Sequence, residues 1–198
     1  LADSTTTTTG DSGSSASVDW KAWEAPACEF GTMPIFGNPE CQPVGAACPS
    51  GIWPDSVVAE GSVVYVSAGG TGDGASQSSP LGSLAAAIEL VGSEGTVVVS
   101  KGRYTEAIDV HGRVHILGTC AAETVLVAPS VDDIDPVIDL TGSGGAIIEN
   151  VMVTGERVGV WIWANETPVH LRGVIIDGAR VNGLLMTDDG AGATIEDL

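Results

Sequence analysis

Three stretches decide the fold of this chain: AIIENVMV at residues 146–153, VHLRGVII at 169–176 and ATIEDL at 193–198. They begin 23 and then 24 positions apart and share a pattern of short β-branched runs ending in Gly, Asn or Asp. A repeat in the low twenties with this composition is typical of a solenoid, in which each coil buries its apolar side on the next. The last repeat stops at Leu198, so the sequence predicts an incomplete C-terminal coil.

Outward from these repeats, short β-branched runs continue toward the N-terminus. We expect strands at residues 62–68, 96–100, 107–110, 114–118, 124–128 and 137–140. One helix is predicted between them, at residues 83–91, because Ser83 is a natural N-cap and Gly92 a natural stop. Leu84, Ala87, Ile88 and Val91 share one face at helical spacing. This helix is well placed to cover the first coil.

The composition divides the chain into three parts. Residues 1–17 are rich in Ser, Thr and Gly and are expected to be a leader or linker, since such a tract buries little apolar surface. Residues 18–60 hold most of the Trp, Phe and Cys among prolines, and they predict an irregular wrap over the body. Residues 61–198 carry the repeats. Glycosylation candidates are the run Thr5, Thr6, Thr7, Thr8 and Thr9, and Asn165 in the sequon Asn-Glu-Thr.

The charge of the chain excludes several partners. It has 26 Asp and Glu against 7 Lys and Arg, for a net charge of −19. Nucleic acid needs basic partners for its phosphates, so we expect no nucleic-acid binding. No apolar run approaches the roughly 18 residues of a membrane span, so no transmembrane segment is expected.

The four cysteines allow three pairings, with free buried thiols as the alternative. We favour Cys28 with Cys41 and Cys48 with Cys120, the second pair tying the wrap to the repeats. None of the four forms a CxxC pair, and disulfides in a core-poor segment indicate an oxidising compartment. The sequence therefore predicts a secreted or extracellular cell-surface protein.

One long segment carries a family resemblance. VYVSAGGTGDGASQSSPLGSLAAAIELVGSEGTVVVSKGRYTE, followed by VHILGT and TVLVAP, resembles the opening of pectin-lyase-like proteins. The resemblance covers roughly residues 63–198. It implies a right-handed parallel β-helix with an N-terminal capping helix and a disulfide-pinned irregular leader, as in secreted or surface-anchored bacterial proteins. It does not select a chemistry, because lyases, hydrolases, esterases and adhesins share it.

Catalytic groups are sparse on these repeats. In the related esterases a Gln stands where this chain has VGVWIW at residues 158–163, which holds no titratable group. A hydrolase would need converging aspartates. The candidates are the loop residues Asp132, Asp133 and Asp135 and the pair Asp188 and Asp189, and neither group has the surrounding motif of the hydrolase family. A lyase would need Ca²⁺ and a basic residue. His115 is expected at an ordinary outward position in a strand.

A metal site has one candidate. Asp132, Asp133 and Asp135 are oxygen donors of the kind that Ca²⁺ prefers. They lack the spacing of an EF-hand loop. We expect no cofactor, with Ca²⁺ at this loop as the alternative.

The sharper signal is aromatic. Alternate side chains of a strand point the same way, and the repeat aligns Val160 and Ile162 with Leu184 and Met186, which predicts these four as interior residues. The other positions of these two strands alternate with them and are expected to face outward: Trp161, Trp163, Leu185 and Thr187. An exposed tryptophan pair calls for a covering group. The wrap, a second copy of the chain or a sugar ring could each supply it.

These observations favour a non-catalytic extracellular structural or adhesive module that contacts polysaccharide or glycan, or assembles with copies of itself into a surface fibre. Trp161, Trp163 and Leu185 are its predicted contact residues. The alternative is a polysaccharide lyase or glycoside hydrolase acting on acidic polysaccharide, with most of its catalytic residues beyond residue 198.

Overall fold

The structure is a computed structural model that describes residues 23–59, 61–129, 135–155, 158–163, 167–187 and 192–198. Its elements in chain order are β1 (Thr32–Pro34), β2 (Cys41–Pro43), β3 (Ser62–Val66), α1 (Leu84–Val91), β4 (Glu94–Val99), β5 (Gly102–Thr105), β6 (Ile108–Asp109), β7 (Arg113–Gly118), β8 (Thr124–Val127), β9 (Ile138–Asp139), β10 (Ile147–Thr154), β11 (Val160–Trp163), β12 (Val169–Asp177), β13 (Leu184–Thr187) and β14 (Ala193–Glu196).

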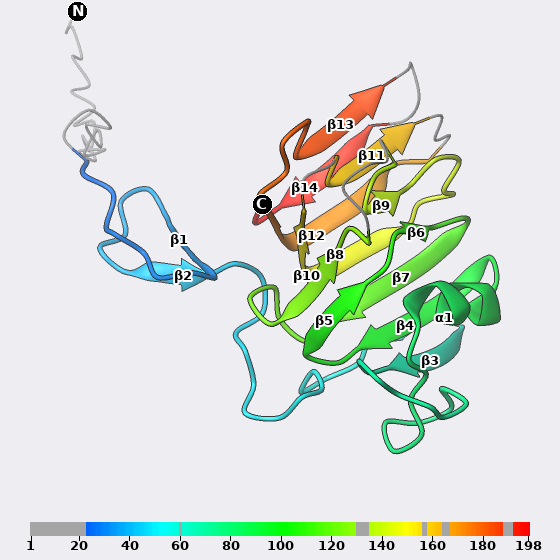
Figure 1. The fold of residues 1–198 in the computed structure, drawn as a ribbon. Helices are drawn as coiled ribbons and strands as arrows, with labels where there is room; N and C mark the ends of the chain where they lie inside the picture. The colour runs from blue at the N-terminus through cyan, green and yellow to red at the C-terminus, as the bar shows by residue number, and fades with distance from the viewer. Residues whose placement is uncertain (1–22, 60, 130–134, 156–157, 164–166, 188–191) are drawn as a thin grey trace, which may run out of the picture.

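Two parallel sheets make up the body (Figure 1). The large sheet has the order β14-β12-β10-β7-β4-β3; β8 also pairs with β10, and β5 pairs with β8. The small sheet has the order β13-β11-β9-β6. One buried apolar cluster takes its side chains from the inward positions of both sheets, including Val97, Ile116 and Ile148 from the large sheet and Ile138 and Val160 from the small one. The core therefore lies between the two sheets.

The prediction of a right-handed parallel β-helix is wrong, because the strands form parallel sheets in which no solenoid is detected. The reason is visible in the register. The strand partners Val63, Thr96, His115 and Ile147 stand 33, 19 and 32 positions apart along the chain. A solenoid requires one repeated unit, and within the large sheet the spacing of 23 and 24 positions is confined to β10, β12 and β14. The all-β class with one short helix and two disulfides is as expected.

Within those last strands the predicted register is confirmed. Ile148 pairs with Leu171, and Leu171 pairs with Ile195. β10 bends at Asn150, which has a positive φ of 56°, and β12 bends at Gly173 with a φ of 54°. Asn and Gly are the residues that accept this left-handed conformation most readily. The bend lets β10 pair with β7 before Asn150 and with β8 after it.

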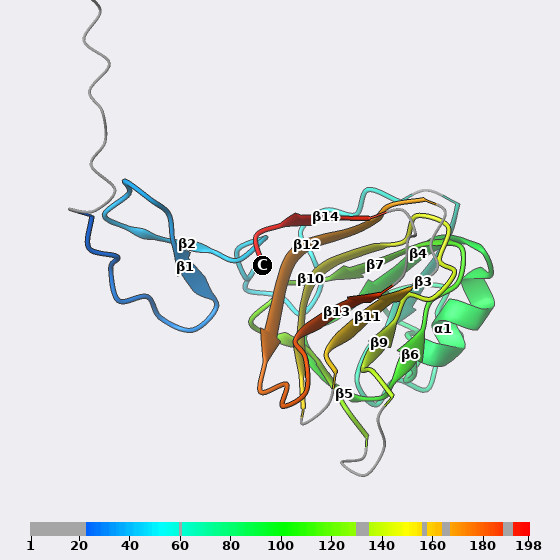
Figure 2. The same cartoon turned by 90° about the horizontal axis from the view of Figure 1, so that it is seen from above.

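The helix is placed as predicted. In α1 the Ser83 hydroxyl accepts a hydrogen bond from the N–H of Ala86, and the helix ends at Gly92. Its buried face is the predicted one, and the helix packs on β3, β4 and β6 at one end of the sheets (Figure 2). A second cap comes from Glu106, whose carboxylate accepts hydrogen bonds from the Ser83 hydroxyl and from the N–H groups of Leu84 and Ala85.

The segment expected as an irregular wrap has two different parts. Its first part forms the antiparallel hairpin β1–β2, which projects away from the sheets in both views (Figures 1 and 2). Its second part, residues 44–59, returns along the large sheet, and we call it the strap. The short strands expected from residue 62 to residue 140 are present, whereas β1, β2 and β5 are additions to the expected set.

Candidate functional site

The small sheet places both predicted tryptophans on its outward face. Val160 and Ile162 are buried, so the alternate residues Trp161 and Trp163 point away from the core. The two indole rings stack with centroids 6.2 Å apart and planes 19° apart. Trp163 is 43% exposed. The pair therefore presents a flat aromatic surface, as the alternation in the sequence predicts.

A hydrogen bond from the next strand orients this surface. The indole Nε1–H of Trp161 donates to the hydroxyl of Thr187 at 3.0 Å. Thr187 is the register partner of Trp163, and Leu185 is the partner of Trp161. Leu185 is half-buried, so β13 supports the indole rings from one side. The orientation of Trp161 is thus set before any ligand arrives.

The prediction that four residues of β11 and β13 are interior is only partly correct. Val160 and Ile162 are buried, but Leu184 is half-buried and Met186 is 46% exposed. Both face the core side of β13, which is the last strand of the small sheet. An edge strand has a neighbour on one side only, so its inward side chains keep contact with water.

Carboxylates continue the row of Trp161 across the small sheet. Asp139 is the register partner of Trp161, and Asp109 is the partner of Asp139. Asp109 is exposed and Asp139 is half-buried. One Asp139 oxygen accepts a hydrogen bond from the N–H of Thr141 at 2.8 Å, which fixes that carboxylate. We call Asp109, Asp139, Trp161 and Leu185 the outward row.

The aromatic residues of the 18–60 segment have partners elsewhere. Trp23 packs edge-on against Phe36 beside the hairpin, with ring centroids 5.2 Å apart. Trp53, in the strap, packs edge-on against Tyr65 of β3 at 5.6 Å. The hairpin and the strap are thus occupied away from the small sheet. Of the three coverings expected for the tryptophan pair, the wrap is the one that these contacts disfavour.

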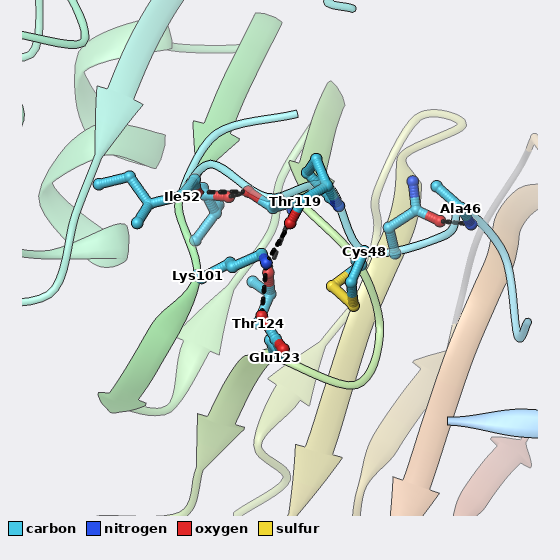
Figure 3. Close-up of a disulfide and its surroundings, with 11 residues drawn as sticks. Ala46, Cys48, Ile52, Lys101, Thr119, Glu123 and Thr124 are labelled. Atoms are coloured by element: carbon cyan, nitrogen blue, oxygen red, sulfur yellow. Dashed lines mark hydrogen bonds and ion pairs between the residues drawn. A yellow bond between two sulfur atoms is a disulfide. The ribbon is translucent and has the colours of Figure 1, made fainter. Parts of the chain in front are cut away.

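The strap is fixed to the large sheet by covalent and polar contacts (Figure 3). Both predicted disulfides are present: Cys28–Cys41 in the hairpin and Cys48–Cys120 between strap and sheet. The Lys101 ammonium donates to the carbonyl of Pro49 at 2.6 Å and pairs with Glu123. The hydroxyl of Thr119 and the N–H of Lys101 both donate to the carbonyl of Ile52.

Beneath the strap lies a polar cluster that the sequence did not indicate. His115 Nε2 lies 3.0 Å from Glu149 Oε2, and both side chains are largely covered. Arg172 is the register partner of Glu149, and its Nε lies 3.3 Å from a Glu196 oxygen. Cavities of about 230 Å³ and 460 Å³ meet at His115 and Glu149, and Val58 of the strap borders both.

The chemistry of this cluster is set by Glu149. The hydrogen bond from His115 lowers the pKa of the Glu149 carboxyl below its usual range, with His115 and Arg172 charges acting in the same direction against the effect of burial. Glu149 therefore stays a carboxylate and acts as an acceptor. A general acid needs the opposite shift.

Sequence reasoning missed the pair because His115 and Glu149 stand 34 positions apart in strands whose spacing departs from the repeat. The available signal was the pair of alternations VHIL and IIEN, each of which turns one polar side chain outward.

The motif residues of the segment 100–106 have structural positions. The Tyr104 side chain is buried, its hydroxyl donates to the carbonyl of Ser100 at 2.9 Å, and burial raises its pKa. Together with the capping role of Glu106, this gives both side chains a structural role.

The remaining candidates are the acidic residues and the glycosylation positions. Asp132, Asp133, Asp188, Asp189, Asn165 and the run Thr5–Thr9 lie outside the described residues, while Asp135 is described and exposed. Among described side chains, one group has ligand atoms close enough for a metal, namely Cys48, Cys120 and Glu123. Its two sulfurs are joined in a disulfide, so they are not thiolate ligands.

Two further findings bear on the environment of the protein. The two disulfides suggest an extracellular or secreted protein. In the described part of the chain, no helix is both long and apolar enough to cross a membrane.

Comparison with known proteins found no family model, no curated protein and no solved structure that matches this chain. Nothing in these comparisons identifies the chain as a member of the pectin-lyase-like family that it resembles.

Proposed function

We propose that this protein is a non-catalytic extracellular module that binds glycan through the outward Trp161–Trp163 pair. The observation that carries the proposal is the near-parallel stacking of the two rings on an exposed sheet face. Flat aromatic faces suit the apolar faces of sugar rings, and the polar edges of a sugar need hydrogen-bond acceptors nearby. Asp139, level with Trp161, supplies such an acceptor.

Rigidity supports this assignment. The backbone under the pair is held by buried Val160 and Ile162, and the Trp161 ring is held by Thr187. A surface that is ordered before binding loses less conformational entropy when a ligand docks. The strand therefore acts as a preformed aromatic platform.

The test is glycan binding by array and by calorimetry with three variants. Trp161→Ala and Trp163→Ala are each expected to weaken binding about ten-fold, which corresponds to about 1.4 kcal/mol. Phe30→Ala is the matched control, because Phe30 is an exposed aromatic residue (64%) near the hairpin. Binding that survives both tryptophan changes in a folded protein would overturn the proposal.

The same platform could instead contact a second copy of the chain. Sedimentation at rising protein concentration separates the two occupants. Self-association that disappears in Trp161→Ala, together with no glycan binding, would assign the platform to assembly.

The alternative is a lyase or hydrolase acting on acidic polysaccharide, and the His115–Glu149 pair is the observation that favours it. The lowered pKa of Glu149 makes it a poor general acid, so we rank this function second. If the protein released unsaturated product from polygalacturonate with Ca²⁺ and His115→Ala lost this activity, the enzymatic function would become the leading proposal.

A further inference from the structure

The outward row continues beyond the tryptophans toward the helix end of the small sheet. Leu185, Trp161, Asp139 and Asp109 stand on the adjacent strands β13, β11, β9 and β6. Neighbouring strands lie about 4.8 Å apart. A ligand that crosses the strands from the aromatic end therefore meets an indole ring and then two carboxylates at successive steps.

The row ends at a cavity of about 390 Å³ beside α1. Asp109 lines this cavity together with Glu89 of α1 and the exposed His111. Acidic side chains from two elements thus meet where the row ends. A chain-like ligand on the platform has room for its terminal unit there.

The charges of the row select the sign of the ligand. Its four members include two carboxylates and no basic side chain, in a protein of net charge −19. An acidic polysaccharide would be repelled by this field, whereas a cation would be attracted. The indole faces add to the attraction, since a cation over an indole ring is favoured by the ring quadrupole.

We propose that the outward row binds a saccharide chain that carries ammonium groups, that is, an oligomer of an amino sugar with free amino groups. A sugar ring stacks on Trp161 and Trp163, and ammonium groups of the following units meet Asp139 and Asp109. This inference rests on the proposed glycan-binding function and adds the chemical class of the glycan.

The test compares two oligomers of equal length by calorimetry: glucosamine oligomer, with its amino groups protonated, and the fully N-acetylated oligomer. Wild-type protein is expected to bind the glucosamine oligomer at least ten-fold more tightly. Asp109→Asn with Asp139→Asn should abolish this preference. Asn retains the oxygen that accepts from Thr141, so the turn after β9 is kept. Asp55→Asn, on the strap, is the matched control and should leave the preference unchanged.

The outcomes separate this inference from the proposed function. Equal binding of both oligomers, lost in Trp161→Ala, would overturn the amino-sugar assignment and leave glycan binding intact. Binding of neither oligomer would overturn the amino-sugar assignment, and only the absence of all glycan binding on the array would overturn the proposed function as well. Oligolysine binding as tightly as the glucosamine oligomer, and surviving Trp161→Ala, would show a general polycation surface and overturn the saccharide assignment. A loss of the preference in Asp55→Asn as large as that in the double variant would also overturn the assignment to the outward row.

Discussion

The side chain of Asn150 accepts a hydrogen bond from the backbone N–H of Ala46 at 2.8 Å, joining positions 104 residues apart. Asn150 is buried and stands at the bend of β10 in the left-handed conformation. One residue thus turns the strand and holds the strap. Gly45 of the strap also packs closely against Gly173 of β12, because a β-carbon added at Gly45 would lie 2.7 Å from the Gly173 Cα.

Two variants separate these roles of Asn150. Asn150→Gly loses the bond to Ala46 but keeps the left-handed backbone, and we expect about 1 kcal/mol lower free energy of unfolding. Asn150→Ala also puts at this bend a residue that accepts the left-handed conformation less readily than Asn or Gly, and we expect a further loss of about 1 kcal/mol. Urea denaturation measures both. Equal destabilisation would mean that the bend carries no conformational cost.

Gly45 is expected to tolerate no side chain. An added β-carbon would lie 2.7 Å from the Gly173 Cα and 2.3 Å from the Asn150 side-chain oxygen. Gly37→Ala is the control, since Gly37 also has a positive φ but nothing within 4 Å. We expect Gly45→Ala to lower the free energy of unfolding by about 2 kcal/mol more than the control, because overpacking adds to the shared backbone strain. Similar denaturation midpoints for the two variants would contradict this close contact.

The two disulfides are expected to act on different parts of the molecule. Cys48–Cys120 spans 72 positions and joins the strap to the large sheet. The loop-entropy model gives about 4 kcal/mol for a loop of this length, so its double Ala variant should lose about that much global stability. Cys28–Cys41 spans 13 positions within the projecting hairpin segment.

Removal of Cys28–Cys41 is therefore the control. It should leave the main thermal transition nearly unchanged while limited proteolysis near the hairpin becomes faster. A large fall in the main transition would show that the hairpin folds as part of the body.

The contribution of Glu149 to stability should depend on pH. Its pKa is lower in the folded state than the ordinary 4.5, first because of the bond from His115. The stabilisation is therefore present above that ordinary value and is lost as the pH falls through the folded-state pKa. Glu149→Gln should be less stable than wild type near neutral pH, and the difference should shrink in acid.

His115→Phe supplies the complementary measurement. Removing the imidazole should raise the pKa of Glu149 toward its ordinary range, as read by NMR titration of the carboxyl carbon. An unchanged titration in that variant would assign the shift to Arg172 instead.

Much of the local structure follows from the sequence. Ser83 and Gly92 bound the helix as their capping preferences predict, and the alternation in VWIW turns Trp161 outward. These features depend on neighbours within a few positions. The register of β10, β12 and β14 also follows, because their nearly equal spacing aligns the same side chains.

Only the tertiary structure decided how the strands combine. The chain between successive strands of the large sheet varies from rung to rung, so the repeat does not extend into a solenoid and the partners of β7 were not predictable. The same holds for the bond between Asn150 and Ala46, the pair of His115 with Glu149, and the alignment of Asp109 with Trp161 through Asp139. Short-range periodicity selects the face of a side chain, whereas the lengths and contacts of the connections select its neighbours.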